Sequence, residues 1–250
     1  LKGFNSSMEL PFLSNSEKKG ASVLFDIDFD LSKKIKALSN KLNVNQYSVM
    51  LSAYFIFLKQ LTGDTDLLVG APVSTRGNED FKNVLGLFLD TTFIRKKISP
   101  NDIKSKFIRD VYRTSRLAIR NSSNQIEDGN KIKGKTKNYN YTNIFFNYLD
   151  FVNNESLFDF YKENPGVDLN FDLNLYCVSF EDNFKFKLDY RLANFSRKSI
   201  DILVSIFIET LSLLVNGNVD QKISSFITRE AELVKTSLGS IEHPWLVFER

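Results

Sequence analysis

The first half of the chain alternates between strand-like and helix-like patterns of apolar residues. Residues 23–31 (VLFDIDFDL) alternate apolar with acidic residues, which predicts a half-buried strand whose three aspartates share one wet face. In residues 32–41, Ile and Leu recur at helical spacing with Lys opposite, which predicts a helix with Ser32 as its N-cap. Residues 46–60 are apolar almost all round, which predicts a buried central helix.

Between residues 63 and 95, two strand-like runs enclose a loop. Residues 67–69 are wholly apolar and follow a Gly-Asp turn, which predicts a buried strand. Residues 87–94 alternate imperfectly and are rich in Phe and Thr, which suits a strand with two unlike faces. Binding residues often lie in loops mounted on buried strands. The candidate binding residues in this loop are Ser74, Thr75 and Arg76. The alternative interpretation is an ordinary surface turn.

Residues 100–120 repeat apolar residues along one side of a long predicted helix. Basic residues dominate the other side, namely Lys104, Lys106, Arg109, Arg113, Arg116 and Arg120. That basic face would suit an acidic partner, and a solvated surface is the alternative interpretation. Residues 121–140 are polar, contain Gly and hold few apolar residues, so we expect a long mobile loop there.

Strand-like runs gather in the second half, at residues 142–149, 169–180 and 184–190. The last two are joined by a short polar connection, which predicts a hairpin. In residues 184–190, Phe and Leu alternate with Lys and Asp, so one face of that strand is expected to be wet. A final helix is predicted over residues 196–215, with Ser196 as its N-cap. Together these elements predict an α/β sandwich with a mixed sheet.

Length and composition place this chain among globular proteins. Its 250 residues, of which 42% are hydrophobic and 23 are Phe, are ample for a packed core. We expect a linker or leading arm over residues 1–22, a folded unit over 23–235, and a tail or a linker to a following domain over 236–250. A net charge of +3 argues against a nucleic-acid partner. No run approaches the roughly 20 apolar residues of a membrane span and no signal pattern opens the chain, which predicts a cytoplasmic protein without a membrane partner.

No reaction centre is evident from residue patterns. The chain carries no phosphate loop, no dinucleotide-binding glycine fingerprint and no metal-ligand cluster. Its single cysteine, Cys177, lies in an apolar run, which predicts a buried inert thiol and excludes an intrachain disulfide. Its single histidine, His243, lies in the expected tail. No sequence motif links any candidate carboxylate to a second catalytic group. The candidates are Asp90, Asp150, Asp172 and Asp189. Residue patterns therefore assign no catalytic residue and no metal.

Five runs, taken together, resemble the C-terminal half of a condensation domain from a nonribosomal peptide synthetase. TGDTDLLVGAPVSTR at 62–76 and VLGLFLDTTFIR at 84–95 resemble the family runs tGxxDxxxGxPxxxR and xxGxFxNTxxxR. Residues 143–150, 169–175 and 188–195 resemble its fxvxFnyxn, xKFDLxL and leYxxxLF runs. The five runs agree in order and spacing from about residue 10 to about residue 232.

The resemblance implies one lobe of a chloramphenicol-acetyltransferase-like fold, a two-layer sandwich. In this family two lobes form a V, and an acceptor amine attacks a donor thioester in the tunnel between them. Both substrates arrive on phosphopantetheine arms of peptidyl carrier proteins, so no directly bound cofactor is expected. Residues 86–92 would correspond to the crossing that helps to floor the tunnel. The implied tunnel or loop residues are Ser74, Thr75, Arg76, Gly86, Phe88, Asp90 and Thr91.

Two departures from the family pattern bear on function. The catalytic His-His-x-x-x-Asp-Gly run belongs to the N-terminal lobe and is absent here, and the Asn of the FxNT run is Asp90. We therefore expect a tunnel-forming C-terminal lobe, inactive alone, whose partners are an upstream N-terminal lobe, in the same or another polypeptide, and carrier proteins. One alternative is a noncatalytic module that docks carriers through Arg109, Arg113 and Arg116. Another is a stand-alone acyltransferase with an intersubunit site and His243 as base.

Overall fold

The computed structural model describes residues 18–74, 83–86, 88–131, 142–150, 169–180, 183–195 and 197–226. One mixed sheet runs through this part of the chain, in the order β1-β6-β5-β4-β2-β3. Its strands are β1 (Gly20–Asp26), β2 (Asp66–Ser74), β3 (Leu89–Lys97), β4 (Ile144–Asp150), β5 (Leu173–Ser179) and β6 (Phe184–Arg191). Strands β2, β4 and β5 run parallel, and the remaining pairs are antiparallel.

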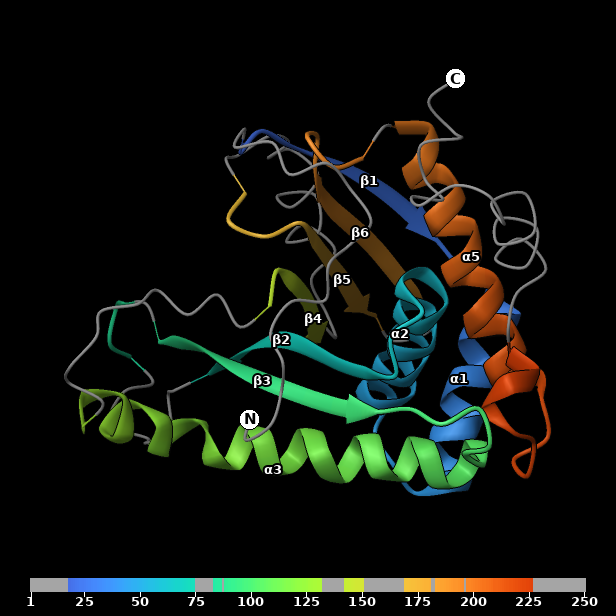
Figure 1. Ribbon diagram of the computed structural model, residues 1–250. Helices are drawn as coiled ribbons and strands as arrows, with labels where there is room; N and C mark the ends of the chain where they lie inside the picture. The colour runs from blue at the N-terminus through green and yellow to red at the C-terminus, as the bar shows by residue number, and fades with distance from the viewer. Residues whose placement is uncertain are drawn as a thin grey trace.

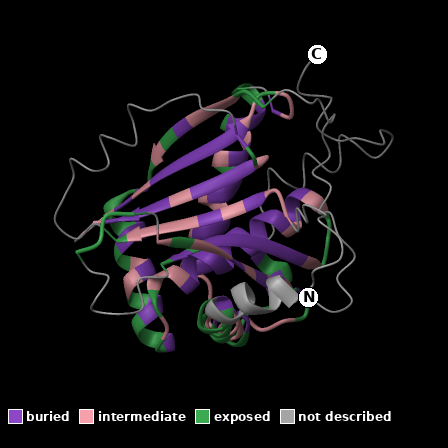
Figure 2. Ribbon diagram, turned by 90° about the vertical axis from the view of Figure 1, so that its left-hand side faces the viewer, coloured by how far each residue is buried: buried purple, intermediate pink, exposed green. Residues whose placement is uncertain are grey.

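Helices complete the sandwich, and this confirms the predicted mixed α/β architecture. They are α1 (Phe29–Leu42), α2 (Gln46–Thr62), α3 (Lys104–Lys131) and α5 (Arg197–Asn216), followed by the short 3₁₀ helix η2 (Ile223–Phe226). Helix α2 packs against the other three α-helices, and α3 runs alongside β3 (Figure 1). Figure 2 shows burial concentrated in the strands and in the helix faces that they meet.

Helix α2 forms the centre of the core, as its apolar pattern predicts. Every residue from Ser48 to Leu58 is buried. Asn45 caps its first turn by accepting a 3.0 Å hydrogen bond from the backbone N–H of Ser48. Gly63, with a φ of 78°, ends the helix in the left-handed conformation that glycine tolerates best.

Phe207 of α5 joins the layers of the core. Its ring lies 5.6 Å from that of Phe186, 5.9 Å from that of Phe57 and 6.2 Å from that of Phe25, so one side chain links α5 to β6, α2 and β1. Helix α5 is the one helix in the described part of the chain with the length and composition of a membrane span. Half of its most apolar stretch is buried inside the protein, as a core helix of this length would be.

The acidic run at the start of α1 differs from its prediction. Strand β1 ends at Asp26, and Asp28 is the N-cap of α1, its carboxylate accepting a 2.7 Å hydrogen bond from the N–H of Leu31. Asp30 lies in the first turn, where a carboxylate favours the positive end of the helix dipole. The three aspartates therefore share no strand face, and Ser32, predicted as N-cap, is buried one turn inside the helix.

Two predicted boundaries are also wrong. Helix α3 continues to Lys131, into the segment predicted as a mobile loop from residue 121. Extending a formed helix costs far less than nucleating one, so polar residues can continue it. Strand β1 begins at Gly20, inside the predicted leading arm. Residues 1–17, Ser196 and the tail with His243 lie outside the described residues.

Two predicted wet faces contain buried charges. Lys187 and Asp189, on the polar side of β6, are buried and form an ion pair of 3.2 Å, and Ser22 of β1 donates a 2.5 Å hydrogen bond to Asp189. Lys104, assigned to the solvated side of α3, is fully buried and donates to the carbonyl of Gly217 beyond the end of α5. Specific protein partners stabilise these charges. The alternating pattern had instead predicted that water would surround them.

Candidate functional site

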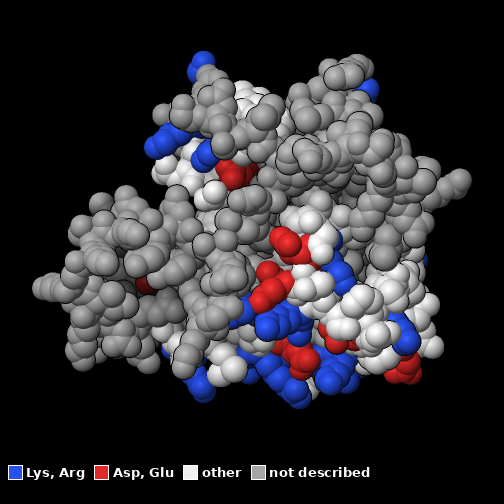
Figure 3. Space-filling view, viewed as in Figure 1, with Lys and Arg blue, Asp and Glu red and all other residues white. Residues whose placement is uncertain are grey.

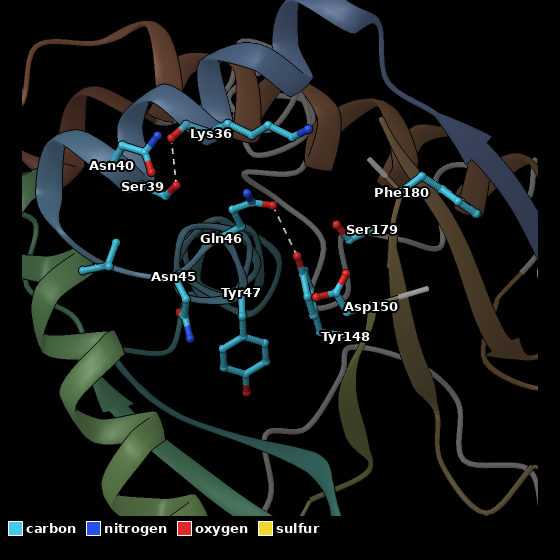
Figure 4. Close-up of a pocket in the computed structure, with 11 residues that line it drawn as sticks. Lys36, Ser39, Asn40, Asn45, Gln46, Tyr47, Tyr148, Asp150, Ser179 and Phe180 are labelled. Carbon is cyan, nitrogen blue, oxygen red and sulfur yellow. Dashed lines mark hydrogen bonds between the residues drawn. The ribbon is translucent and has the colours of Figure 1, made fainter. Parts of the chain in front are cut away.

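A pocket of about 680 Å³ opens where the carboxyl ends of the parallel strands β4 and β5 meet the junction between α1 and α2 (Figure 4). The carboxyl ends of parallel strands are a common location for binding sites in α/β sheets. The side chains that matter chemically are Lys36, Gln46, Tyr47, Tyr148, Asp150 and Ser179.

Local structure places these side chains on three walls. Lys36 comes from α1, while Gln46 and Tyr47 are the first two residues of α2 and are placed there by the Asn45 cap. Asp150 ends β4 directly opposite Ser179, the last residue of β5. Tyr148 lies two residues before Asp150, so both project from the same face of the strand.

The two tyrosines form an aromatic wall within the pocket. The ring of Tyr47 lies 5.8 Å from that of Tyr148 at 86° and 5.6 Å from that of Phe146. The Tyr148 hydroxyl faces the side-chain oxygen of Gln46 across 3.5 Å (Figure 4). Edge-to-face packing of this kind fixes the positions of the Tyr47 and Tyr148 rings.

Burial keeps both phenol groups neutral. It raises the pKa of Tyr47 above its usual range. It is also the main cause of the raised pKa of Tyr148, to which Cys177 and Asp150 add and which a hydrogen bond with Ser179 opposes. Both hydroxyls therefore stay protonated at neutral pH. That of Tyr148 directs its hydrogen to Gln46 and can still accept hydrogen bonds.

The structure gathers several of the predicted tunnel residues at the loop end of the β2–β3 hairpin, where β2 ends and β3 begins. Ser74 pairs with Leu89, and the next two positions along β3, Asp90 and Thr91, pair with β2 in the same register. The Asp90 carboxylate accepts a 2.7 Å hydrogen bond from the N–H of Thr91. The carboxyl end of β2 faces the same sheet edge as those of β4 and β5, so Ser74 shares that edge with the pocket without lining it.

The remaining predicted tunnel residues are only partly described. Gly86 and Phe88 precede β3, and a Cβ on Gly86 would lie 3.3 Å from the Phe88 ring, so a larger residue there would have to displace the ring. Thr75 and Arg76 lie outside the described residues. The role of the whole set in a tunnel stays a prediction.

The three candidate docking arginines lie on the exposed side of α3, which runs along the lower part of Figure 3. Arg113 lies 3.4 Å from Asp110, and Arg116 donates a 3.0 Å hydrogen bond to the hydroxyl of Tyr112. Blue and red atoms alternate there, so this surface is basic but not uniformly so (Figure 3). Arg109 reaches the carbonyl of Leu42 at 3.4 Å.

Residue patterns missed most of the pocket. The sequence patterns give Asp150 as a carboxylate without a partner and place Gln46, Tyr47 and Tyr148 in predicted elements without a functional role. The usable signal is the alternation of Phe146, Tyr148 and Asp150, which runs along one strand face from a buried ring to an exposed carboxylate. Within the described residues no three His, Cys, Asp or Glu side chains are grouped to hold a metal. Cys177 is fully buried, as predicted, and burial raises the pKa of its thiol.

Comparison with known proteins identifies the family. The sequence profile of the Condensation domain matches residues 1–233. Bacitracin synthase 2 of Bacillus licheniformis is 24% identical over 217 residues, covering 83% of this chain and 8% of that protein. Gramicidin S synthase 2 of Aneurinibacillus migulanus is 25% identical over 218 residues, covering 82% of this chain and 5% of that protein. The chain thus spans less than a tenth of these relatives.

Solved structures share the fold. The condensation domain of the Monacolin K polyketide synthase MokA superposes with a TM-score of 0.69 at 16% identity, covering 88% of this chain and 52% of that one. The X-domain from teicoplanin biosynthesis gives a TM-score of 0.71 at 13% identity, covering 89% and 54%. Because the family profile spans nearly the whole sequence, this chain belongs to the condensation-domain family.

Proposed function

We propose that this chain is the C-terminal lobe of a condensation domain and forms one side of a tunnel in which carrier-bound aminoacyl or peptidyl thioesters are joined. The observation that carries the proposal is coverage: nearly the whole chain superposes on 52% of one solved condensation domain and 54% of an X-domain. The named relatives are peptide synthases, so we assign the parent polypeptide to peptide-antibiotic biosynthesis.

In the proposed reaction, the nitrogen of the acceptor amine bonds to the donor carbonyl carbon. The carbon–sulfur bond to the donor's phosphopantetheine breaks, and the departing thiol takes up the proton that the amine loses. This chain carries a single histidine, His243, so it cannot supply a His-His motif. We therefore assign the general base to the upstream lobe and assign to this lobe the positioning of both arms.

Asp90 gives the proposed tunnel a distinct chemistry. An Asn at this position offers both a donor and an acceptor, whereas an ionised Asp only accepts hydrogen bonds. One carboxylate oxygen of Asp90 already accepts from the N–H of Thr91. We infer that Asp90→Asn would restore a donor at this place without disturbing the backbone contact.

Exposed apolar residues near Asp90 support the proposal that a partner covers this part of the surface. Leu85, in the segment that connects β2 to β3, is fully exposed, and Leu89, the first residue of β3, is more than half exposed. Leucines so exposed become stabilising when another surface covers them. We assign that surface to the upstream lobe.

Assembly of the two lobes tests this assignment. The chain, mixed with a separately expressed upstream lobe, is expected to form a one-to-one complex in analytical ultracentrifugation. Leu85→Asp should weaken that complex, while Leu192→Asp, which alters a half-exposed leucine in the turn after β6, should not. Equal loss with both variants, or no complex with the unaltered chain, would refute the assignment.

The second candidate function is noncatalytic docking of an acidic carrier protein. The exposed row formed by Arg109, Arg113 and Arg116 on α3 favours it. The variant Arg113→Glu with Arg116→Glu should then abolish carrier binding, while leaving assembly with the upstream lobe intact. Carrier binding without amide formation in the assembled lobes would favour docking over the tunnel function.

A further inference from the structure

The wall of the pocket formed by β4 and β5 presents mostly hydrogen-bond acceptors. The Asp150 carboxylate, the Tyr148 hydroxyl and the Ser179 hydroxyl all lie at the carboxyl ends of these two strands (Figure 4). Their spacing follows from the register, because Asp150 and Ser179 are direct neighbours across the parallel pair. Such a group of oxygens is complementary to a donor with several hydrogens.

Asp150 lacks a compensating cation in the part of the chain that the structure describes. Within the described residues, no Lys or Arg nitrogen lies within 4.0 Å of its carboxylate; the ion pairs that do form involve other aspartates, for example Asp66 with Arg95 and Asp172 with Arg191. Tyr148 and Ser179, which line the pocket with Asp150, carry neutral hydroxyls, one of a phenol and one of an alcohol. Asp150 is exposed and its carboxylate lies at the β4–β5 end of a pocket of ligand size, whereas Lys36 lines the same pocket from α1.

The rest of the pocket suits the body of a peptide-like ligand. The rings of Tyr47 and Phe180 offer apolar and aromatic surface, and the Lys185 ammonium already lies 5.3 Å from the centre of the Phe180 ring. Gln46 engages Tyr148 through its side-chain oxygen, and its amide N–H groups are available to a ligand carbonyl. These features together favour a chain that carries both an ammonium group and amide groups.

We propose that this pocket binds a primary ammonium group borne on a short amide-containing chain, such as the amino terminus of a peptide, with Asp150, Tyr148 and Ser179 receiving the ammonium. An anion is disfavoured at this end because it would face the Asp150 carboxylate. The site lies wholly within this chain, so it goes beyond the proposed tunnel function and does not depend on amide formation.

Binding is measured on the 250-residue chain alone, by ligand-observed NMR titration with three probes. The probes are glycyl-phenylalaninamide, its N-acetylated form, and N-acetyl-glycyl-phenylalanine with a free carboxylate. The first should bind, and acetylation should weaken binding roughly tenfold or more, because it removes the positive charge and two of the three N–H donors of the ammonium. The third probe should not bind better than the second.

Two variants locate the ammonium. Asp150→Asn keeps the shape of the side chain and removes its charge, so it should raise the Kd of the amine probe by roughly tenfold or more. Asp26→Asn is the matched control, because Asp26 is an exposed aspartate that ends β1 outside the pocket. Its Kd should be unchanged.

Three results would overturn the proposal: equal binding of the acetylated and free amines, an unchanged Kd for Asp150→Asn, or no binding of the amine probe. Preference for the carboxylate probe would assign the pocket to anions through Lys36. None of these results bears on lobe assembly or product formation, so failure here is distinct from failure of the proposed function.

Discussion

Lys104 should make the stability of this fold rise with pH in the alkaline range. Its side chain is fully buried, donates to the Gly217 carbonyl and lies 5.7 Å above the ring of Phe226. Burial, with a smaller contribution from Lys41, lowers the pKa of Lys104 from 10.5 to about 8. Between these two values the folded protein loses a proton that the unfolded chain still holds. The free energy of unfolding therefore increases with pH across this window.

The size of the effect follows from the two pKa values. Going from pH 7.5 to pH 9.5, the contribution of Lys104 to the free energy of unfolding should rise by about 2 kcal/mol at most. Lys104→Met keeps an unbranched side chain and removes the titrating group, so this rise should disappear. Urea denaturation at both pH values measures the difference between the two proteins.

Lys106→Met is the control for this prediction, since Lys106 is an exposed lysine on the same helix. It should leave the pH dependence of the unfolding free energy unchanged. If wild type and Lys104→Met gain the same stability between pH 7.5 and pH 9.5, the buried ammonium is not the source and our account of the α3–α5 contact is wrong.

Three further predictions concern the fold and are read from chemical denaturation. Phe207→Ala should destabilise the protein by about 3–5 kcal/mol, because it removes the ring that joins α5 to β1, β6 and α2; a loss below about 1 kcal/mol would contradict this. Asp28→Ala should cost about 0.5–2 kcal/mol through loss of the α1 cap, whereas Asp26→Ala should be nearly neutral; equal losses would remove the capping role. Asp189→Asn should cost roughly 3 kcal/mol by leaving Lys187 buried without a counter-charge, and a second change, Lys187→Met, should recover part of that loss.

Periodic patterns predicted those helices and strands whose burial follows from the spacing of their own apolar residues. The apolar run at 46–60 became α2, and the alternating run at 184–190 became β6, paired as a hairpin with β5. In both cases the spacing of apolar residues matches the geometry of the element, and burial of that face stabilises it. Local pattern was sufficient there.

Local pattern was insufficient where the partner lies far along the chain. The alternation in β6 distinguishes its two faces but does not reveal that Lys187 and Asp189 are covered, with Ser22 of β1 as a hydrogen-bond partner. The pocket also depends on residues that are far apart along the chain, since Gln46 and Tyr148 are separated by 102 residues in sequence. No neighbouring residue specifies such contacts, because the sheet order creates them.

Amide formation by reassembled lobes tests the central claim most directly. The chain is incubated with aminoacyl-loaded donor and acceptor carriers, alone and with the separately expressed upstream lobe, and amide product is followed by mass spectrometry. Our account predicts product only when the upstream lobe is present. Product from this chain alone would contradict it and would direct attention to His243 or a carboxylate of this chain. Absence of product from lobes that demonstrably assemble and bind carriers would also contradict it.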